Sequence, residues 1–224
     1  MEGTEKPRVK ICCINSIEEG KMAMEFGASA LGLVSAMPSG PGVISEEHIT
    51  SIAASIPPGV SSFLLTSKQD AESIIAQQRR CRTNTIQLVD AVPIHVYEEL
   101  REALPGISLV QVVHVRNEDS FHEARGVAEH VDALLLDSGN PTLVVKQLGG
   151  TARTHDWSVS RKIREAVDVP LFLAGGLHAG NVAQAIAEVQ PYGVDLCSGV
   201  RTNGALDRSK LAEFFTAVNS VGTS

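Results

Sequence analysis

Short apolar runs alternate with amphipathic segments along almost the whole of this chain. The runs are rich in Val, Ile and Leu and lack a regular alternation of apolar and polar residues, which is typical of parallel strands buried on both faces. There are eight runs: Val9–Ile14, Ala30–Val34, Val60–Thr66, Thr85–Val89, Leu109–Val115, Val131–Leu136, Val169–Ala174 and Val194–Cys197.

The segments between the runs have helical spacing, and several begin with a residue type that caps helices. Strands that alternate with helices over short connections predict a parallel sheet. The predicted helix starts are at Ser16, Ser45, Asp70, Asp119, Asn181 and Asp207.

Eight such units in 224 residues predict an α/β fold, a single (β/α)8 TIM barrel with a parallel eight-stranded core. We expect one domain over residues 1–224, with a flexible N-terminal tail over residues 1–7. The alternative is a doubly wound open sheet, for which a GxGxxG turn is expected after the first strand. The turn here reads CCINSIEEG, which favours the barrel.

Composition excludes several classes of protein. A net charge of −7 disfavours a nucleic-acid partner. No apolar run reaches the ~20 residues that cross a bilayer, and the start MEGTEKPR has no hydrophobic signal core. The sequence thus predicts a cytoplasmic protein without membrane contact. The four cysteines show no CxxC spacing and the seven histidines are scattered, so we expect free thiols and no metal site.

In a (β/α)8 barrel, chemistry belongs to the carboxyl ends of the strands. The first run carries Cys12-Cys13 near its end, and the sixth is followed by Asp137-Ser138. Gly175-Gly176 and Ser198-Gly199 follow the last two runs. Glycine lets backbone N–H groups approach an anion, and a following helix adds a favourable dipole. These two neighbouring loops predict a phosphate site, with ordinary tight turns as the alternative.

Five stretches of the chain carry a family resemblance. VKICCIN resembles the first strand of phosphoribosylanthranilate isomerase, a (β/α)8 enzyme of tryptophan biosynthesis. ALLLDS is similar to its sixth strand, GGTARTHDW to the long loop after that strand, LFLAGGLHAGNV to its seventh strand and loop, and GVDLCSGVR to its eighth. The order is kept over nearly the whole chain, so the combination is specific although each piece alone is weak.

The resemblance implies an Amadori rearrangement of an N-phosphoribosyl amine to a 1-amino-1-deoxyribulose 5-phosphate, without metal or organic cofactor. It implies that Cys12 is the base that removes the sugar C2 proton and that Asp137 is the acid that protonates the ring oxygen. Asp195 becomes a candidate ligand of the sugar hydroxyls. The partner implied is a small phosphorylated sugar amine, and the sequence leaves open a monomer or a homodimer.

Alternation of side chains divides the first run into two faces. Lys10 and Cys12 are predicted to point into the barrel, where Lys10 contributes to substrate binding and stabilises a thiolate at Cys12. Ile11 and Cys13 are predicted to pack against helices. The alternative role for Cys12 is that of a buried small hydrophobe, and for Asp137 that of an N-cap.

In the HDW triplet, Asp156 is predicted to cap the following helix and His155 to be a loop residue.

The sequence departs from the family pattern around the aromatic end of the substrate. The second βα loop, PSGPGV, lacks the arginine that the family carries there, and the fourth run ends in Val89-Asp90 rather than His-Gly. Arg153 and Arg201 are the candidates to replace that arginine. Three hypotheses follow: an isomerase of this type, a paralogue that isomerises or binds a different phosphorylated sugar derivative, and a non-catalytic phosphate-ligand-binding barrel.

Overall fold

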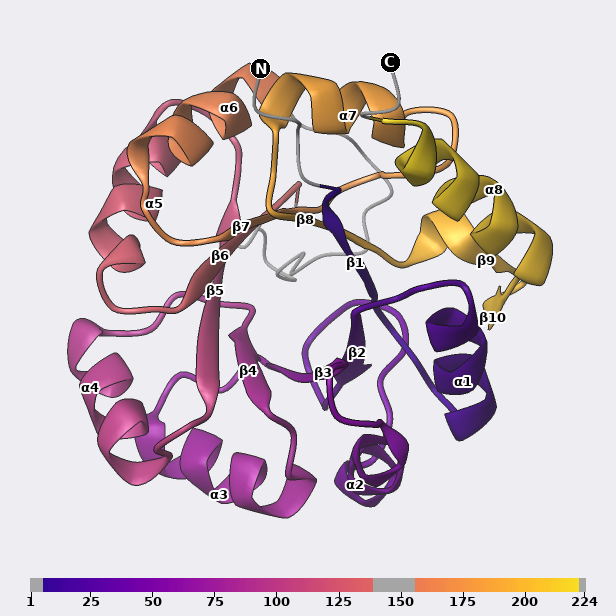
Figure 1. Ribbon diagram of the computed structural model, residues 1–224. Coiled ribbons are helices and arrows are strands. Elements are labelled where there is room, and N and C mark those ends of the chain that lie inside the picture. The colour runs from indigo at the N-terminus through magenta and orange to yellow at the C-terminus, as the bar shows by residue number, and fades with distance from the viewer. Residues whose placement is uncertain (1–5, 139–155, 222–224) are drawn as a thin grey trace.

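Eight parallel strands form a closed barrel (Figure 1). The structure, a computed structural model, describes residues 6–138 and 156–221. The strands are β1 (Arg8–Ile11), β2 (Ala30–Val34), β3 (Ser61–Thr66), β4 (Thr85–Leu88), β5 (Ser108–His114), β6 (Ala133–Asp137), β7 (Leu171–Leu173) and β8 (Gly193–Leu196). β1 pairs with β2 on one side and with β8 on the other, where Lys10 lies opposite Asp195. This closure confirms the predicted barrel and excludes the open sheet.

Helices follow the strands and surround the barrel (Figure 1). They are α1 (Ile17–Glu25), α2 (Glu46–Ser55), α3 (Ala71–Cys81), α4 (Ile94–Ala103), α5 (Asp119–Ala128), α6 (Trp157–Ala166), α7 (Val182–Val189) and α8 (Arg208–Ser220). The predicted caps Ser16, Ser45, Asp70 and Asp207 accept hydrogen bonds from first-turn N–H groups. Asp156 caps α6 in the same way, as predicted. α4 follows Pro93, which has no capping side chain, and so lacked a sequence signal at its start.

Strand side chains divide into two layers. Ile11, Leu64 and Leu136 face the helices and belong to the larger apolar core. Phe63 and Phe172 fill the interior of the barrel and meet edge to face, with ring centroids 6.0 Å apart. Because side chains fill this interior, ligand chemistry is confined to the mouth of the barrel.

The first apolar run is shorter as a strand than the sequence suggests. β1 ends at Ile11, and the backbone of Cys13 adopts a φ of 62°, in the left-handed region that favours glycine. This turn ends the regular alternation of faces. The prediction that Cys13 packs against helices is therefore wrong, because Cys13 belongs with Cys12 to the cluster inside the barrel.

A short hairpin follows β8. The 3₁₀ turn η1 (Ser198–Val200) leads into β9 (Arg201–Thr202), which pairs antiparallel with β10 (Ala205–Leu206). Asn203 and Gly204 connect them, both with positive φ, as two-residue hairpin turns require. The pattern of apolar runs does not predict this hairpin, although its Asn-Gly pair is a recognisable signal.

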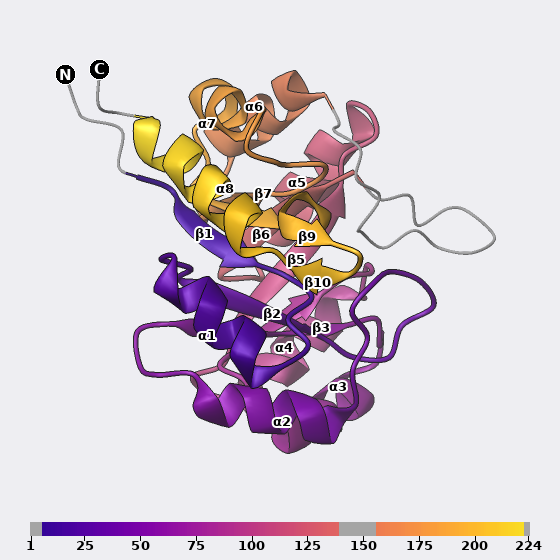
Figure 2. The same cartoon turned by 90° about the vertical axis from the view of Figure 1, so that its right-hand side faces the viewer.

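The start of β1 and the end of α8 lie at one end of the barrel, and the loop after β2 lies toward the other (Figure 2). Most of the tail predicted over residues 1–7 lies outside the described residues. Within the described part of the chain, no helix is long and apolar enough to cross a membrane.

Candidate active site

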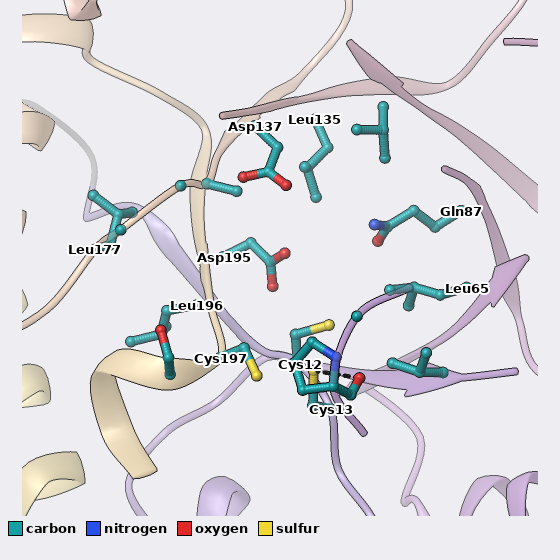
Figure 3. A pocket seen from close by; sticks show the side chains of 18 of the residues that line it. Cys12, Cys13, Leu65, Gln87, Leu135, Asp137, Leu177, Asp195, Leu196 and Cys197 are labelled. Carbon is teal, nitrogen blue, oxygen red and sulfur yellow. Dashed lines mark hydrogen bonds between the residues drawn. The ribbon is translucent and has the colours of Figure 1, made fainter. Parts of the chain in front are cut away.

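A cavity opens at the carboxyl ends of the strands, where the βα loops meet. It holds about 700 Å³ of space, part of it open to solvent. Figure 3 shows the side chains that point into it. Residues on or directly after all eight strands line it: Cys12, Val34, Leu65, Gln87, Val112, Asp137, Ala174 and Asp195.

Asp137 ends β6 and is 7% exposed. The backbone N–H of Ser138 donates to its Oδ1 at 2.8 Å. Burial raises the pKa of Asp137, and the hydrogen bond from Ser138 and the charge of His114 offset only part of this effect. A carboxyl group whose pKa is raised keeps its proton to higher pH, which suits a general acid.

Lys10 and Asp195 form a buried ion pair between β1 and β8. The Nζ of Lys10 donates to Oδ1 of Asp195 at 2.8 Å, and the two side chains are 0% and 8% exposed. Burial alone lowers the pKa of Lys10, but the Asp195 carboxylate outweighs it, so the pKa of Lys10 is raised. Asp195 lines the cavity, whereas Lys10 is not among its lining residues.

The thiol of Cys12 lies beside this ion pair. Gly32 on β2 leaves room for both groups, since a Cβ there would lie 2.8 Å from Cys12 Sγ and 3.2 Å from Lys10 Nζ. Both side chains face the barrel interior, as the alternation of faces predicts. The Lys10 ammonium is close enough to interact electrostatically with Cys12.

The loop after β7 exposes backbone donors to the cavity. Gly175 and Gly176 both line it and have φ values of 88° and 63°. Among the described residues, their N–H groups donate to no protein acceptor. The side chain of Asn181 holds the loop in place by donating from Nδ2 to the Gly176 carbonyl at 3.0 Å.

The loop after β8 packs directly against this one. Ser198 lines the cavity, while Gly199 lies against the carbonyl of Leu177, where a Cβ would be 2.1 Å from the oxygen. Glycine is therefore required at position 199 for the two loops to meet. The sequence predicted that these two loops are neighbours, because they follow the last two strands of the barrel.

Gln87 on β4 is a cavity residue to which the sequence analysis gave no role. It is 3% exposed, and its amide points toward the carboxyl groups of Asp137 and Asp195 (Figure 3). Its Oε1 has no hydrogen-bond partner among the described residues. The sequence carries a signal for this role, because Gln87 is a polar residue within an apolar run that forms a strand, and such a residue often faces a site.

Comparison with known proteins decides the family. The model of the family described as N-(5′-phosphoribosyl)anthranilate isomerase matches residues 9–217. The chain belongs to this family. N-(5′-phosphoribosyl)anthranilate isomerase 2 of Methanosarcina mazei is 35% identical over 209 residues, which cover 92% of each chain.

Solved structures of phosphoribosylanthranilate isomerases share the fold. One, in complex with reduced 1-(o-carboxyphenylamino)-1-deoxyribulose 5-phosphate, has a TM-score of 0.79 and 29% identity, covering 95% of this chain and 98% of that one. A monomeric form of the dimeric enzyme of Thermotoga maritima has a TM-score of 0.77, with the same identity and coverage. The family confirms the predicted enzyme class, an isomerase of tryptophan biosynthesis.

The structure removes one candidate for the arginine missing from the phosphoribosylanthranilate isomerase pattern. The guanidinium of Arg201 donates to Glu19 at 2.9 Å and to the Cys13 carbonyl at 2.6 Å, and its side chain is 8% exposed. Arg201 is thus a structural residue of the loop. Arg153 and His155 lie outside the described residues. Among the described residues, no Lys, Arg or His side chain lines the cavity.

Proposed function

We propose that this chain catalyses the Amadori rearrangement of N-(5′-phosphoribosyl)anthranilate by general acid–base catalysis. The observation that carries the proposal is that Cys12, directly after β1, and Asp137, at the end of β6, line one cavity, and that burial raises the pKa of Asp137. Relatives that carry this activity in their names match the chain over nearly its whole length.

Asp137 is the acid in this proposal. It protonates the ribose ring oxygen, which opens the furanose to a Schiff base. Cys12, as a thiolate, removes the proton from the sugar C2, and the resulting enolamine tautomerises to the ketone. The ammonium of Lys10 lies beside the sulfur of Cys12 in this arrangement.

The remaining cavity residues hold the substrate. The N–H groups of Gly175 and Gly176 bind the 5′-phosphate together with the loop of Ser198 and Gly199, since unpartnered backbone donors in glycine turns suit an anion. Asp195, fixed through Oδ1 by Lys10, accepts hydrogen bonds from the sugar hydroxyls. Gln87 offers its amide to the same end of the sugar.

The proposal is tested by supplying freshly made phosphoribosylanthranilate and measuring its turnover as the loss of its fluorescence. We expect Cys12→Ser and Asp137→Asn each to lower kcat by roughly 10²–10⁴-fold, the usual contribution of a positioned acid or base. The matched controls are Cys81→Ala on α3 and Asp168→Asn in the groove around Lys6 and Arg8, away from the cavity. Unchanged turnover in either active-site variant would refute the assigned role.

A second candidate function is isomerisation of a related phosphorylated sugar amine whose aglycone lacks a carboxylate. Two observations favour it. No cationic side chain lies on the described part of the cavity wall, and Arg201 forms an ion pair with Glu19 rather than facing the cavity. Turnover of such a sugar amine, with none of phosphoribosylanthranilate, would decide for it. Binding of ribose 5-phosphate without turnover of either compound would decide for a non-catalytic barrel.

A further inference from the structure

Three of the four cysteines of the chain meet at the cavity, and the proposed reaction uses only one of them. Cys12, Cys13 and Cys197 all line the cavity and are free thiols. Figure 3 shows their sulfur atoms gathered on one wall. The Cys13 thiol lies close enough to the thiols of Cys12 and Cys197 to interact with both electrostatically. Cys13 and Cys197 are therefore a pair of nucleophiles without an assigned role.

The local backbone fixes the direction of the Cys13 thiol. The left-handed turn at Cys13 directs its side chain to the cavity, and Arg201 holds its carbonyl at 2.6 Å. Gly42 packs on the other side, where a Cβ would lie 2.5 Å from that of Cys13. The Cys13 S–H also donates to the Pro41 carbonyl at 3.5 Å. These contacts keep the thiol beside Cys197.

The two thiols of this pair differ in acidity. Hydrogen bonds with Cys12 and Cys197, together with burial, raise the pKa of Cys13. The hydrogen bond from Cys13 and the charge of Arg201 outweigh burial and lower the pKa of Cys197. Cys197 is also the more exposed, being only half-buried. A low-pKa, accessible thiol beside a second thiol is the arrangement found at oxidation-sensitive sites.

We propose that Cys13 and Cys197 form a reversible disulfide when the protein meets hydrogen peroxide. The Cys197 thiolate attacks the peroxide, so that an S–O bond forms, the O–O bond breaks and hydroxide leaves. The Cys13 sulfur then attacks the sulfenic acid, an S–S bond forms, and the oxygen departs as water with the Cys13 proton. The peroxide is reduced to water and the two thiols are oxidised.

Geometry favours this pair over Cys12 and Cys13. The peptide bonds of the described residues are all trans, so the Cα atoms of adjacent residues are about 3.8 Å apart, below the roughly 4.4–6.8 Å that disulfides span. Cys13 follows β1 and Cys197 follows β8, so the two are not adjacent in the chain and this limit does not apply to them. Formation of the disulfide removes the Cys13 S–H group that donates a hydrogen bond to the Pro41 carbonyl, and it shifts the loop that follows Cys12. We expect turnover to fall by roughly 10²-fold, as for a catalytic group misplaced by about 1 Å.

The test treats the full chain with hydrogen peroxide, blocks remaining thiols by alkylation, and maps the cross-link by mass spectrometry. We expect an intact mass lower by two hydrogen atoms, a cross-link that contains Cys197, and full reversal by dithiothreitol. Cys12 and Cys13 share the tryptic peptide of residues 11–21, so Cys12→Ser identifies the partner and must still form the cross-link. A cross-link lost in Cys12→Ser, or stable oxidation without a disulfide, would overturn the proposal.

Matched variants test whether the disulfide causes the loss of turnover. Cys13→Ser and Cys197→Ser should lose the cross-link and the dithiothreitol-reversible inactivation, each relative to its own untreated activity. Cys81→Ala, which removes a buried cysteine on α3, should behave like the wild type in both respects. Reversible inactivation that persists in Cys13→Ser would refute the link. Mapping the cross-link does not depend on the proposed function. If the reduced protein has no isomerase activity, the cross-link can still be tested.

Discussion

The two carboxyl groups of the site lie in contrasting surroundings. Asp195 receives a hydrogen bond from the buried ammonium of Lys10 at 2.8 Å. Asp137 receives the backbone N–H of Ser138, a weaker partner than a cation, and burial dominates its pKa. Contrasting environments around titratable groups are a general way in which a site separates an acid from a carboxylate. Here the contrast comes from one residue, Lys10 on β1, whose side chain reaches Asp195 on the neighbouring strand β8.

The raised pKa of Asp137 predicts a stability change of definite sign. A carboxyl group whose pKa is higher in the folded state binds its proton more tightly there, so it favours folding below its unfolded pKa of about 3.9 and loses this contribution as pH rises through the folded value. Asp137→Asn removes the ionisable group. We expect the variant to gain stability relative to the wild type as pH rises from about 4 to 8, measured by urea unfolding at several pH values. A constant difference across this range would contradict the raised pKa.

A buried ion pair joins the first helix to the hairpin after β8. Glu19 on α1 accepts hydrogen bonds from Arg201 at 2.9 Å and from the Leu206 N–H at 2.8 Å. Burial raises the pKa of Glu19, but these hydrogen bonds outweigh it and lower the pKa overall. Arg201 in turn holds the carbonyl of Cys13. The pair therefore positions the loop that carries the proposed base.

Removing Arg201 should be costly because it leaves the Glu19 carboxylate buried without its partner. We expect Arg201→Met to lower the free energy of unfolding by about 3–5 kcal/mol, measured by chemical denaturation. The matched control is Arg208→Met, which breaks an exposed pair with Glu25 and should cost only about 0–1 kcal/mol. Equal effects of the two variants would show that burial of the Glu19 pair has no energetic consequence.

The contact between the loops after β7 and β8 depends on one glycine. Gly199→Ala places a Cβ 2.1 Å from the Leu177 carbonyl, which is backbone and cannot swing aside. We expect it to weaken ribose 5-phosphate binding and to lower stability by about 1–3 kcal/mol, as overpacking does. Gly126→Ala on α5, which meets open space, is the control and should be neutral or stabilising. Calorimetric titration and urea unfolding measure both effects, and unimpaired binding by Gly199→Ala would contradict the assigned contact.

The order of the elements could be predicted from the sequence because eight apolar runs and several helix caps recur in a fixed pattern. The order of the strands also predicted that the two last loops are neighbours. The end of β1 could not be predicted, since the left-handed turn at Cys13 puts a residue with a side chain where glycine is favoured. The ion pair of Glu19 and Arg201 could not be predicted either, because it joins positions far apart in the chain. Local signals predict elements, whereas side-chain pairing across elements needs the fold.

Closure of the barrel makes the site part of one continuous sheet. Every strand is hydrogen-bonded to two neighbours, and a residue on or directly after each strand contributes to the cavity wall. A ligand bound at the mouth therefore contacts elements from both halves of the chain, from Cys12 to Ser198. The net charge of −7 does not attract a phosphorylated substrate from a distance, so affinity for it must come from these local donors.

A phosphorylated ligand should consequently stabilise the molecule as a whole. A ligand that binds only the folded state adds about 2.7 kcal/mol at a hundredfold excess over its Kd, which for a chain of this size raises Tm by about 5–10 °C. We expect ribose 5-phosphate to produce this shift in differential scanning calorimetry. Inorganic phosphate should produce a smaller one, because it lacks the sugar hydroxyls that are proposed to donate hydrogen bonds to Asp195. Sodium chloride at matched ionic strength is the control for screening. An equal shift with chloride, or an undiminished shift in Gly199→Ala, would place the anion elsewhere than at the two glycine loops.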